Sequence, residues 1–203
     1  VELIQGGAIG TVREAHVWCN RVGPTPQRPK DEPACPPELN WDLWLGPAPD
    51  RPYHPCYLPR QWHFWWDFGG GVIGNVGCHF LDLPFWALEL RHPTTIEAEG
   101  DPISPESTPR RMTIRYEFPA RGNLPPVKLT WYEGGLMPPA PAELPRGQKL
   151  PDNGVLYVGS KGKMYHGSHG GMPQVLPGEL REAAAAVPKT MERSPGHYEE
   201  WVL

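Results

Sequence analysis

The sequence has neither an excess of positive charge nor a long run of apolar residues, and each absence excludes a class of protein. Lysines and arginines number 19 against 23 aspartates and glutamates, which gives a formal net charge of −4. A nucleic-acid-binding domain requires a basic face, so we expect no nucleic-acid partner. No apolar stretch approaches the ~20 residues of a membrane-spanning helix, so we expect no membrane partner. The sequence carries no signal peptide but begins with Val1 instead of Met, which leaves cytoplasmic and exported locations both open.

Closely spaced cysteines are also absent. The four cysteines, Cys19, Cys35, Cys56 and Cys78, form no C-x-x-C pair. Structural zinc sites usually take their ligands in such pairs, so we expect no bound metal. Four scattered thiols are also too few for a disulfide scaffold in a chain of 203 residues. The sequence therefore predicts free thiols, most of them buried.

The most informative segment is residues 65–90, which reads WWDFGGGVIGNVGCHFLDLPFWALEL. Three successive glycines lead into an apolar, helix-like run, and a glycine-rich entry lets a ligand approach the backbone closely. On a helix, Asn75 and His79 stack on one face because they are four residues apart, and Asp82 falls near the same stripe. These three residues are the candidate catalytic groups. The alternative interpretation is that His79 is a satisfied core residue and Asp82 a surface acid.

This segment resembles the helix motif G-G-(G)-x-x-x-D-x-G-x-H-x-x-D of the Gfo/Idh/MocA family of NAD(P)-dependent sugar and cyclitol oxidoreductases. Gly77 matches the inner glycine, and His79 and Asp82 match the histidine and the later aspartate. Three further phrases are similar to one bacterial branch of that family: PELNWDLWLGPAP (37–49), RPYHP (51–55) and PPVKLTWYEGG (125–135). The resemblance runs along almost the whole chain and corresponds to the family's second domain. It implies a substrate-binding domain that forms dimers or tetramers through its sheet.

Two departures from the family pattern bear on activity. Asn75 occupies the position of the family's first aspartate, which in the family is thought to position substrate and tune the histidine. An amide can hydrogen-bond a hydroxyl but cannot accept a proton, so we expect impaired or altered chemistry. The sequence also has no G-x-G-x-x-G phosphate loop after a strand, and the lysine of the family's E-K-P motif would lie in the same missing dinucleotide-binding domain. We therefore expect this chain alone to bind no NAD(P).

Residues 21–66 contain a large share of the 28 prolines, and we expect them to form an irregular excursion rich in tryptophan. Aromatic faces pack well against the C–H surfaces of sugars. The candidate substrate-binding residues are Tyr53, Arg60, His63, Trp65 and Trp66, with Lys128 as a weaker candidate on a predicted strand. The alternatives are that the tryptophans pin the loop onto the sheet and that Lys128 is a solvated strand residue.

The rest of the sequence predicts a single α+β domain over residues 1–203. β-branched and aromatic residues recur between turn signals, which predicts strands at 11–20, 94–99, 111–118, 127–132, 155–158 and 163–166. Short turns between them indicate a largely antiparallel, open sheet with helices on one face. A single helix cannot cover both faces, so we expect an uncovered apolar face to mediate homo-oligomer formation.

Three functions remain open at this point. The first is the substrate-binding and oligomerisation half of a sugar or cyclitol oxidoreductase, not self-sufficient for hydride transfer. The second is a stand-alone carbohydrate-active hydrolase or lyase that uses His79 as its acid or base. The third is a non-catalytic assembly module. In the first two the ligand is a sugar-like small molecule.

Overall fold

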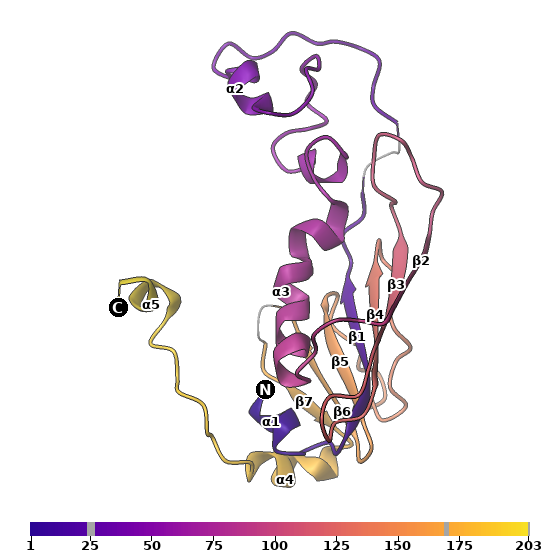
Figure 1. Cartoon of the computed structure of the whole chain (residues 1–203), viewed down its shortest axis with the longest axis vertical. Coiled ribbons are helices and arrows are strands. Elements are labelled where there is room, and N and C mark those ends of the chain that lie inside the picture. The colour runs from indigo at the N-terminus through magenta and orange to yellow at the C-terminus, as the bar shows by residue number, and fades with distance from the viewer. Residues whose placement is uncertain (24–26, 169–170, 203) are drawn as a thin grey trace.

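The computed structural model describes residues 1–23, 27–168 and 171–202. Its central feature is a seven-stranded open sheet with the strand order β2-β3-β4-β1-β5-β6-β7 (Figure 1). The strands are β1 (Val12–Cys19), β2 (Thr95–Gly100), β3 (Met112–Phe118), β4 (Val127–Glu133), β5 (Gly154–Gly159), β6 (Lys163–Gly167) and β7 (Gln174–Leu176). Every pairing is antiparallel except that of β1 with β4. The predicted α+β class and the largely antiparallel open sheet are confirmed.

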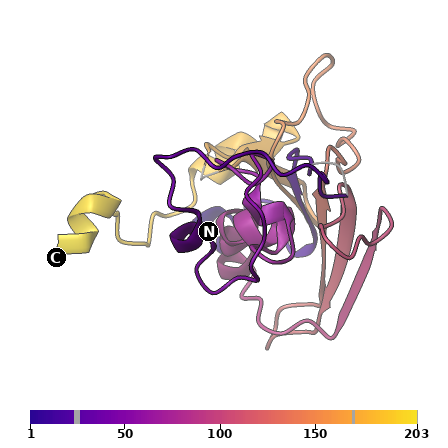
Figure 2. The ribbon, with the colours of Figure 1, turned by 90° about the horizontal axis from the view of Figure 1, so that it is seen from above.

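One long helix, α3 (Gly71–Ala87), crosses a single face of this sheet (Figures 1 and 2). Val72, Val76 and Phe80 recur at helical spacing, and all three are buried in the core between helix and sheet. Phe80 stacks on Trp131 of β4 with ring centroids 6.2 Å apart. The shorter elements are α1 (Glu2–Gln5), α2 (Trp41–Leu45), α4 (Arg181–Ala185), α5 (His197–Val202) and the 3₁₀ turns η1 (Trp62–Phe64) and η2 (Gly178–Leu180).

The six predicted strands are all present, each within one residue of its predicted ends. The order of the strands differs from a succession of hairpins, because β1 lies between β4 and β5. Val17 is opposite Trp131 of β4 on one side and opposite Val155 of β5 on the other. Strand β1 is therefore the centre of the sheet, and its residues Ala15, Val17 and Cys19 lie in the core beneath α3. Strand β7 is an addition that the sequence pattern did not predict.

The proline-rich excursion extends past the end of the sheet, beyond the N-terminal end of α3 (Figure 1). Of this segment the structure describes residues 21–23 and 27–66, which are largely irregular but also contain α2 and η1. Helix α2 forms because Asn40 caps it: the side-chain oxygen of Asn40 accepts the backbone N–H of Leu43 at 3.0 Å. The aromatic rings here pack on one another and on the segment that leads into α3, so the idea that they pin the loop onto the sheet is wrong.

The face of the sheet opposite α3 is not an open apolar surface. Trp18 is fully buried there, and its indole N–H donates at 2.8 Å to a backbone carbonyl of the connection between β4 and β5. On β2, β3 and β4 the same face carries exposed ion pairs, Arg115 with Glu99 at 3.0 Å and Lys128 with Glu117 at 3.3 Å. The expectation of an uncovered apolar face is therefore wrong, because strand alternation places charged residues on this side. Self-association through the sheet stays a prediction.

The four cysteines lie in different environments. All four cysteines are free, as predicted, but only Cys19 is fully buried and Cys78 is exposed.

Within the part of the chain that the structure describes, no helix has the length and apolar character needed to cross a bilayer. Across the same residues, no group of three or more histidine, cysteine and carboxylate side chains is arranged to hold a metal ion.

Candidate substrate-binding site

Helix α3 turns the three candidate catalytic residues away from the sheet. Val76 and Phe80 are buried, whereas His79 and Asp82 are exposed and Asn75 is half-buried. The helix separates the two sets because residues four apart share a face, and the apolar positions occupy the inner one. The interpretation of His79 as a core residue is therefore wrong. An amide, an imidazole and a carboxylate face whatever approaches α3 from the side opposite the sheet.

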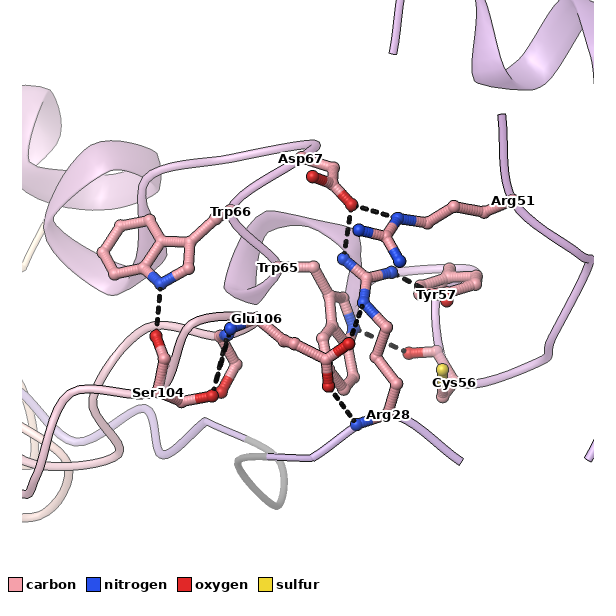
Figure 3. A network of polar contacts seen from close by, with 10 residues as sticks. Arg28, Arg51, Cys56, Tyr57, Trp65, Trp66, Asp67, Ser104 and Glu106 are labelled. Carbon is pink, nitrogen blue, oxygen red and sulfur yellow. Dashed lines mark hydrogen bonds and ion pairs between the residues drawn. The ribbon is translucent and has the colours of Figure 1, made fainter. Parts of the chain in front are cut away.

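The aromatic residues of the excursion form a cluster of stacked and edge-on rings. Trp41 stacks on Trp44 with centroids 4.7 Å apart and meets Tyr53 edge-on at 5.4 Å. Tyr57 lies edge-on to Trp65 at 5.7 Å. Trp65 is 1% exposed, and its indole N–H donates to a backbone carbonyl at 3.4 Å (Figure 3). Tyr53 and Trp65, both predicted to bind substrate, are thus parts of a packed cluster, and Trp65 has almost no surface left for a ligand.

Arg28 joins this cluster to the segments on either side of it (Figure 3). Its guanidinium donates to a carboxylate oxygen of Asp67 at 2.6 Å and to the hydroxyl of Tyr57 at 2.8 Å. Its Nε lies 3.4 Å from Glu106, and Arg51 also pairs with Asp67. Charge-assisted bonds of this kind order the excursion against the start of α3 and the loop before β3. The sequence offered no signal for Arg28, because its carboxylate partner is 39 residues away.

The remaining candidate residues do not converge on one site. Arg60 is exposed, and Lys128 lies on the opposite face of the sheet, so the sheet separates Lys128 from the residues of α3. His63 is buried, and burial lowers the pKa of its imidazole, which is therefore neutral at pH 7. Trp66 is 46% exposed, and its indole N–H donates to the loop before β3 at 2.9 Å (Figure 3). Of these four residues, Trp66 offers a ring face that is partly open and firmly held.

A pocket of about 490 Å³ opens within the excursion, where it meets the segment that leads into α3. The rings of Trp44, Trp62 and Phe68 line it together with Asp67. Rings beside a carboxylate suit a sugar, whose C–H faces pack on aromatic rings and whose hydroxyls donate to oxygen. The sequence shows a surplus of tryptophans here but does not separate Trp44 and Trp62 from the buried Trp65. Only the folded excursion decides which rings border open space.

The residues at the N-terminal end of α3 do not fit a dinucleotide. A pyrophosphate binds a helix N-terminus that follows a strand, where N–H groups and the helix dipole favour an anion. Here the carboxyl of Glu133, which is 1% exposed, already interacts with the backbone N–H of Ile73 in the first turn and accepts the indole N–H of Trp131 at 2.7 Å. Burial raises the pKa of this carboxyl to about 7 in spite of both donors. Because a carboxyl already occupies this helix end, we assign no reaction step to NAD(P) in this chain.

Comparison with known families gives the class of the protein. A family model described as the C-terminal alpha/beta domain of an oxidoreductase family matches residues 17–122, which include the excursion and α3. The match covers more than half of the chain. The chain therefore belongs to the Gfo/Idh/MocA oxidoreductase family, as the resemblance predicted, and carries its C-terminal domain. No curated protein matches the sequence.

Proposed function

We propose that the chain is the substrate-binding half of an NAD(P)-dependent oxidoreductase that acts on a sugar or cyclitol, and that it is not self-sufficient for hydride transfer. The observation that carries this proposal is the position of Asn75, His79 and Asp82 on the outer face of α3. His79 and Asp82 match the family's functional motif, Asn75 stands at the position of its first aspartate, and the sheet lies on the other side of the helix. A substrate bound here becomes enclosed only when a dinucleotide-binding domain covers this face.

His79 is the candidate proton-transfer group on this surface. An imidazole can take a proton from a substrate hydroxyl and return it at neutral pH. Asn75, one turn earlier, offers an amide that both donates to and accepts from a neighbouring hydroxyl. Asp82, three residues later, offers a carboxylate that can orient the imidazole. Because Asn75 carries no charge, it stabilises an imidazolium less than the family's aspartate would.

The aromatic pocket of the excursion supports a substrate of the sugar class. Trp62 is 39% exposed, and Asp67 supplies a carboxylate for hydroxyl donors. The pocket and the α3 motif lie on either side of the short segment that joins η1 to α3. A sugar-like ligand held by the rings would therefore remain close to the helix that carries the motif.

A titration with NAD(H) and NADP(H), followed by the fluorescence of the nine tryptophans, tests the first part of the proposal. We expect no saturable quenching, because the only long helix N-terminus among the described residues already holds Glu133. Saturable binding in the micromolar range would contradict the proposal and indicate a self-sufficient oxidoreductase.

A panel of monosaccharides and cyclitols tests the second part. We expect Trp62→Ala to weaken binding of the best ligand by about fivefold, since stacking on an exposed ring contributes about 1 kcal/mol. Trp86→Ala is the matched control, because Trp86 is also exposed but lies near the other end of α3. Equal losses in the two variants, or no binding at all, would contradict the proposal. Turnover of a glycoside that disappears in His79→Ala would establish a stand-alone enzyme instead.

A further inference from the structure

A second pocket, of about 260 Å³, lies beside α3 on the face of the sheet that the helix covers. It exists because one helix, about 10 Å across, covers only two or three strands spaced about 4.8 Å apart. Helix α3 packs over β1 and β5, which leaves β2 and β3 uncovered at the edge. Ile73 of α3, Ala98 of β2 and Met112 of β3 form apolar walls, and Ile103 borders the pocket from the loop between the two strands.

A buried hydroxyl without a partner lines this pocket. Thr108 is 4% exposed, and its Oγ1 makes no hydrogen bond to the protein. Such an orphaned group is unfavourable and uncommon in native proteins unless another molecule completes it. Its position is fixed, because the backbone N–H of Thr108 donates to the carbonyl of Phe64 at 2.9 Å. Gly71, with φ 74°, leaves the space that Thr108 fills: a Cβ at Gly71 would lie 3.0 Å from Oγ1.

The charged groups around the pocket are already engaged. Asp101 pairs with Arg111 at 2.9 Å, whereas the carboxylate of Glu99 lies on the opposite face of the sheet, where it pairs with Arg115. The buried Glu133 accepts an indole N–H at 2.7 Å. An anion entering the pocket would meet the carboxyl groups of Asp101 and Glu133, and a cation would have to displace Arg111 from Asp101. The pocket therefore favours an uncharged ligand.

Trp66 supplies a flat wall that is held before any ligand arrives. Its indole N–H donates to the carbonyl of Ser104 at 2.9 Å, which fixes the plane of the ring (Figure 3). The hydroxyl of Ser104 in turn accepts the backbone N–H of Glu106 at 3.1 Å. A preformed wall lowers the cost of ordering the site on binding. An apolar ring can stack on the open half of this indole.

We propose that this pocket binds one small uncharged ring that carries a hydroxyl group, with the hydroxyl bonded to Thr108 and the ring against Trp66. A cavity of about 150 Å³ holds a benzene molecule, so about 260 Å³ accommodates one substituted ring. A sugar ring fits this pocket less well, because its many hydroxyls would lie against the apolar walls of Ala98 and Met112. The ligand thus differs in class from the sugar-like substrate, and this pocket is independent of the α3 motif.

Calorimetric titration of the whole chain with phenol tests the proposal, with toluene and benzoate as matched probes. We expect saturable phenol binding and none for benzoate, which carries a charge. In Thr108→Val, phenol should bind about fivefold to tenfold more weakly, because one neutral hydrogen bond is lost, while toluene should bind as before or better. Absence of phenol binding, or binding of benzoate equal to that of phenol, would overturn the proposal.

Two further variants locate the site. Ala98→Met starts from an exposed strand position and extends into the pocket, so it should abolish binding of phenol and toluene together. Thr130→Val makes the same chemical change as Thr108→Val on the opposite face of the sheet, and it should leave binding unchanged. Phenol binding that survives Ala98→Met would place the ligand elsewhere and overturn the proposal. Ala98→Met decides alone if circular dichroism shows that Thr108→Val does not fold.

Discussion

Glu133 couples the stability of the fold to pH. Burial raises the pKa of its carboxyl from an ordinary value of 4.5 to about 7, and the donors Trp131 and Ile73 only partly offset this. Between pH 4.5 and pH 7 the folded chain keeps a proton that the unfolded chain has released. The free energy of unfolding therefore falls as the pH rises through this window.

Glu133→Gln should remove this dependence, because an amide does not titrate. Between about pH 5 and pH 8 we expect the stability of the variant relative to wild type to rise by about 1–3 kcal/mol, measured by urea unfolding. Glu117→Gln, at an exposed position on β3, is the control and should show no such trend. A difference between Glu133→Gln and wild type that stays constant with pH would contradict the raised pKa.

At the scale of the elements, the excursion depends on the pairing of Arg28 with Asp67. In Asp67→Asn, two guanidinium groups that are largely buried lose their shared carboxylate. We expect a local loss of about 3 kcal/mol that opens the excursion while the sheet stays folded. Hydrogen exchange should therefore accelerate in α2 and remain unchanged in β1. Asp101→Asn, whose arginine partner is exposed, should alter neither element, and equal acceleration in both after Asp67→Asn would contradict the local role.

Helix α3 ends in a turn that favours glycine. The N–H of Leu90 donates to the carbonyl of Phe85 at 2.9 Å and that of Glu89 to Trp86 at 3.3 Å, which is the pattern of a Schellman motif. Glu89 has φ 53°, a left-handed conformation that costs a non-glycine residue about 1–2 kcal/mol.

Glu89→Gly should relieve this strain. We expect thermal unfolding to show a gain of about 0.5–1 kcal/mol, because the greater freedom of glycine in the unfolded chain offsets part of the relief. Glu97→Gly is the matched control in the exposed extended strand β2, where glycine should lower stability by a similar amount. A loss of stability in both variants would contradict the strain at Glu89.

At the scale of the whole molecule, the charged residues of β2, β3 and β4 on the sheet face opposite α3 determine how copies of the chain could associate through that face. A contact between copies through Arg115, Glu99 and their neighbours would be polar. We therefore expect sedimentation equilibrium to show association that weakens from about 50 mM to about 500 mM salt, as screening increases. Arg115→Glu should shift the chain toward the monomer, and Arg146→Glu, on the connection between β4 and β5, should not. Association that ignores Arg115 and salt would place the interface elsewhere.

The elements that the sequence predicted share one property: their signals are local. Strands such as β3 and β4 follow from alternating residues, and the inner face of α3 follows from apolar residues four apart. The outer position of Asn75, His79 and Asp82 follows from the same helical period. Strand β7 has three residues and helix α2 has five. Both elements are too short to show a strand or helix period in the sequence.

The sequence by itself determined the α+β class, the extent of the main strands, the family and the stripe of polar residues on α3, because propensity, periodicity and motif spacing act between near neighbours. The tertiary structure alone decided that β1 lies at the centre of the sheet, that Arg28 meets Asp67, and that Glu133 lies at the start of α3. It also decided that Trp62 borders a pocket while Trp65 is buried. These features depend on contacts between segments far apart in the chain, where burial and charge act through space and leave no pattern in the residues between them.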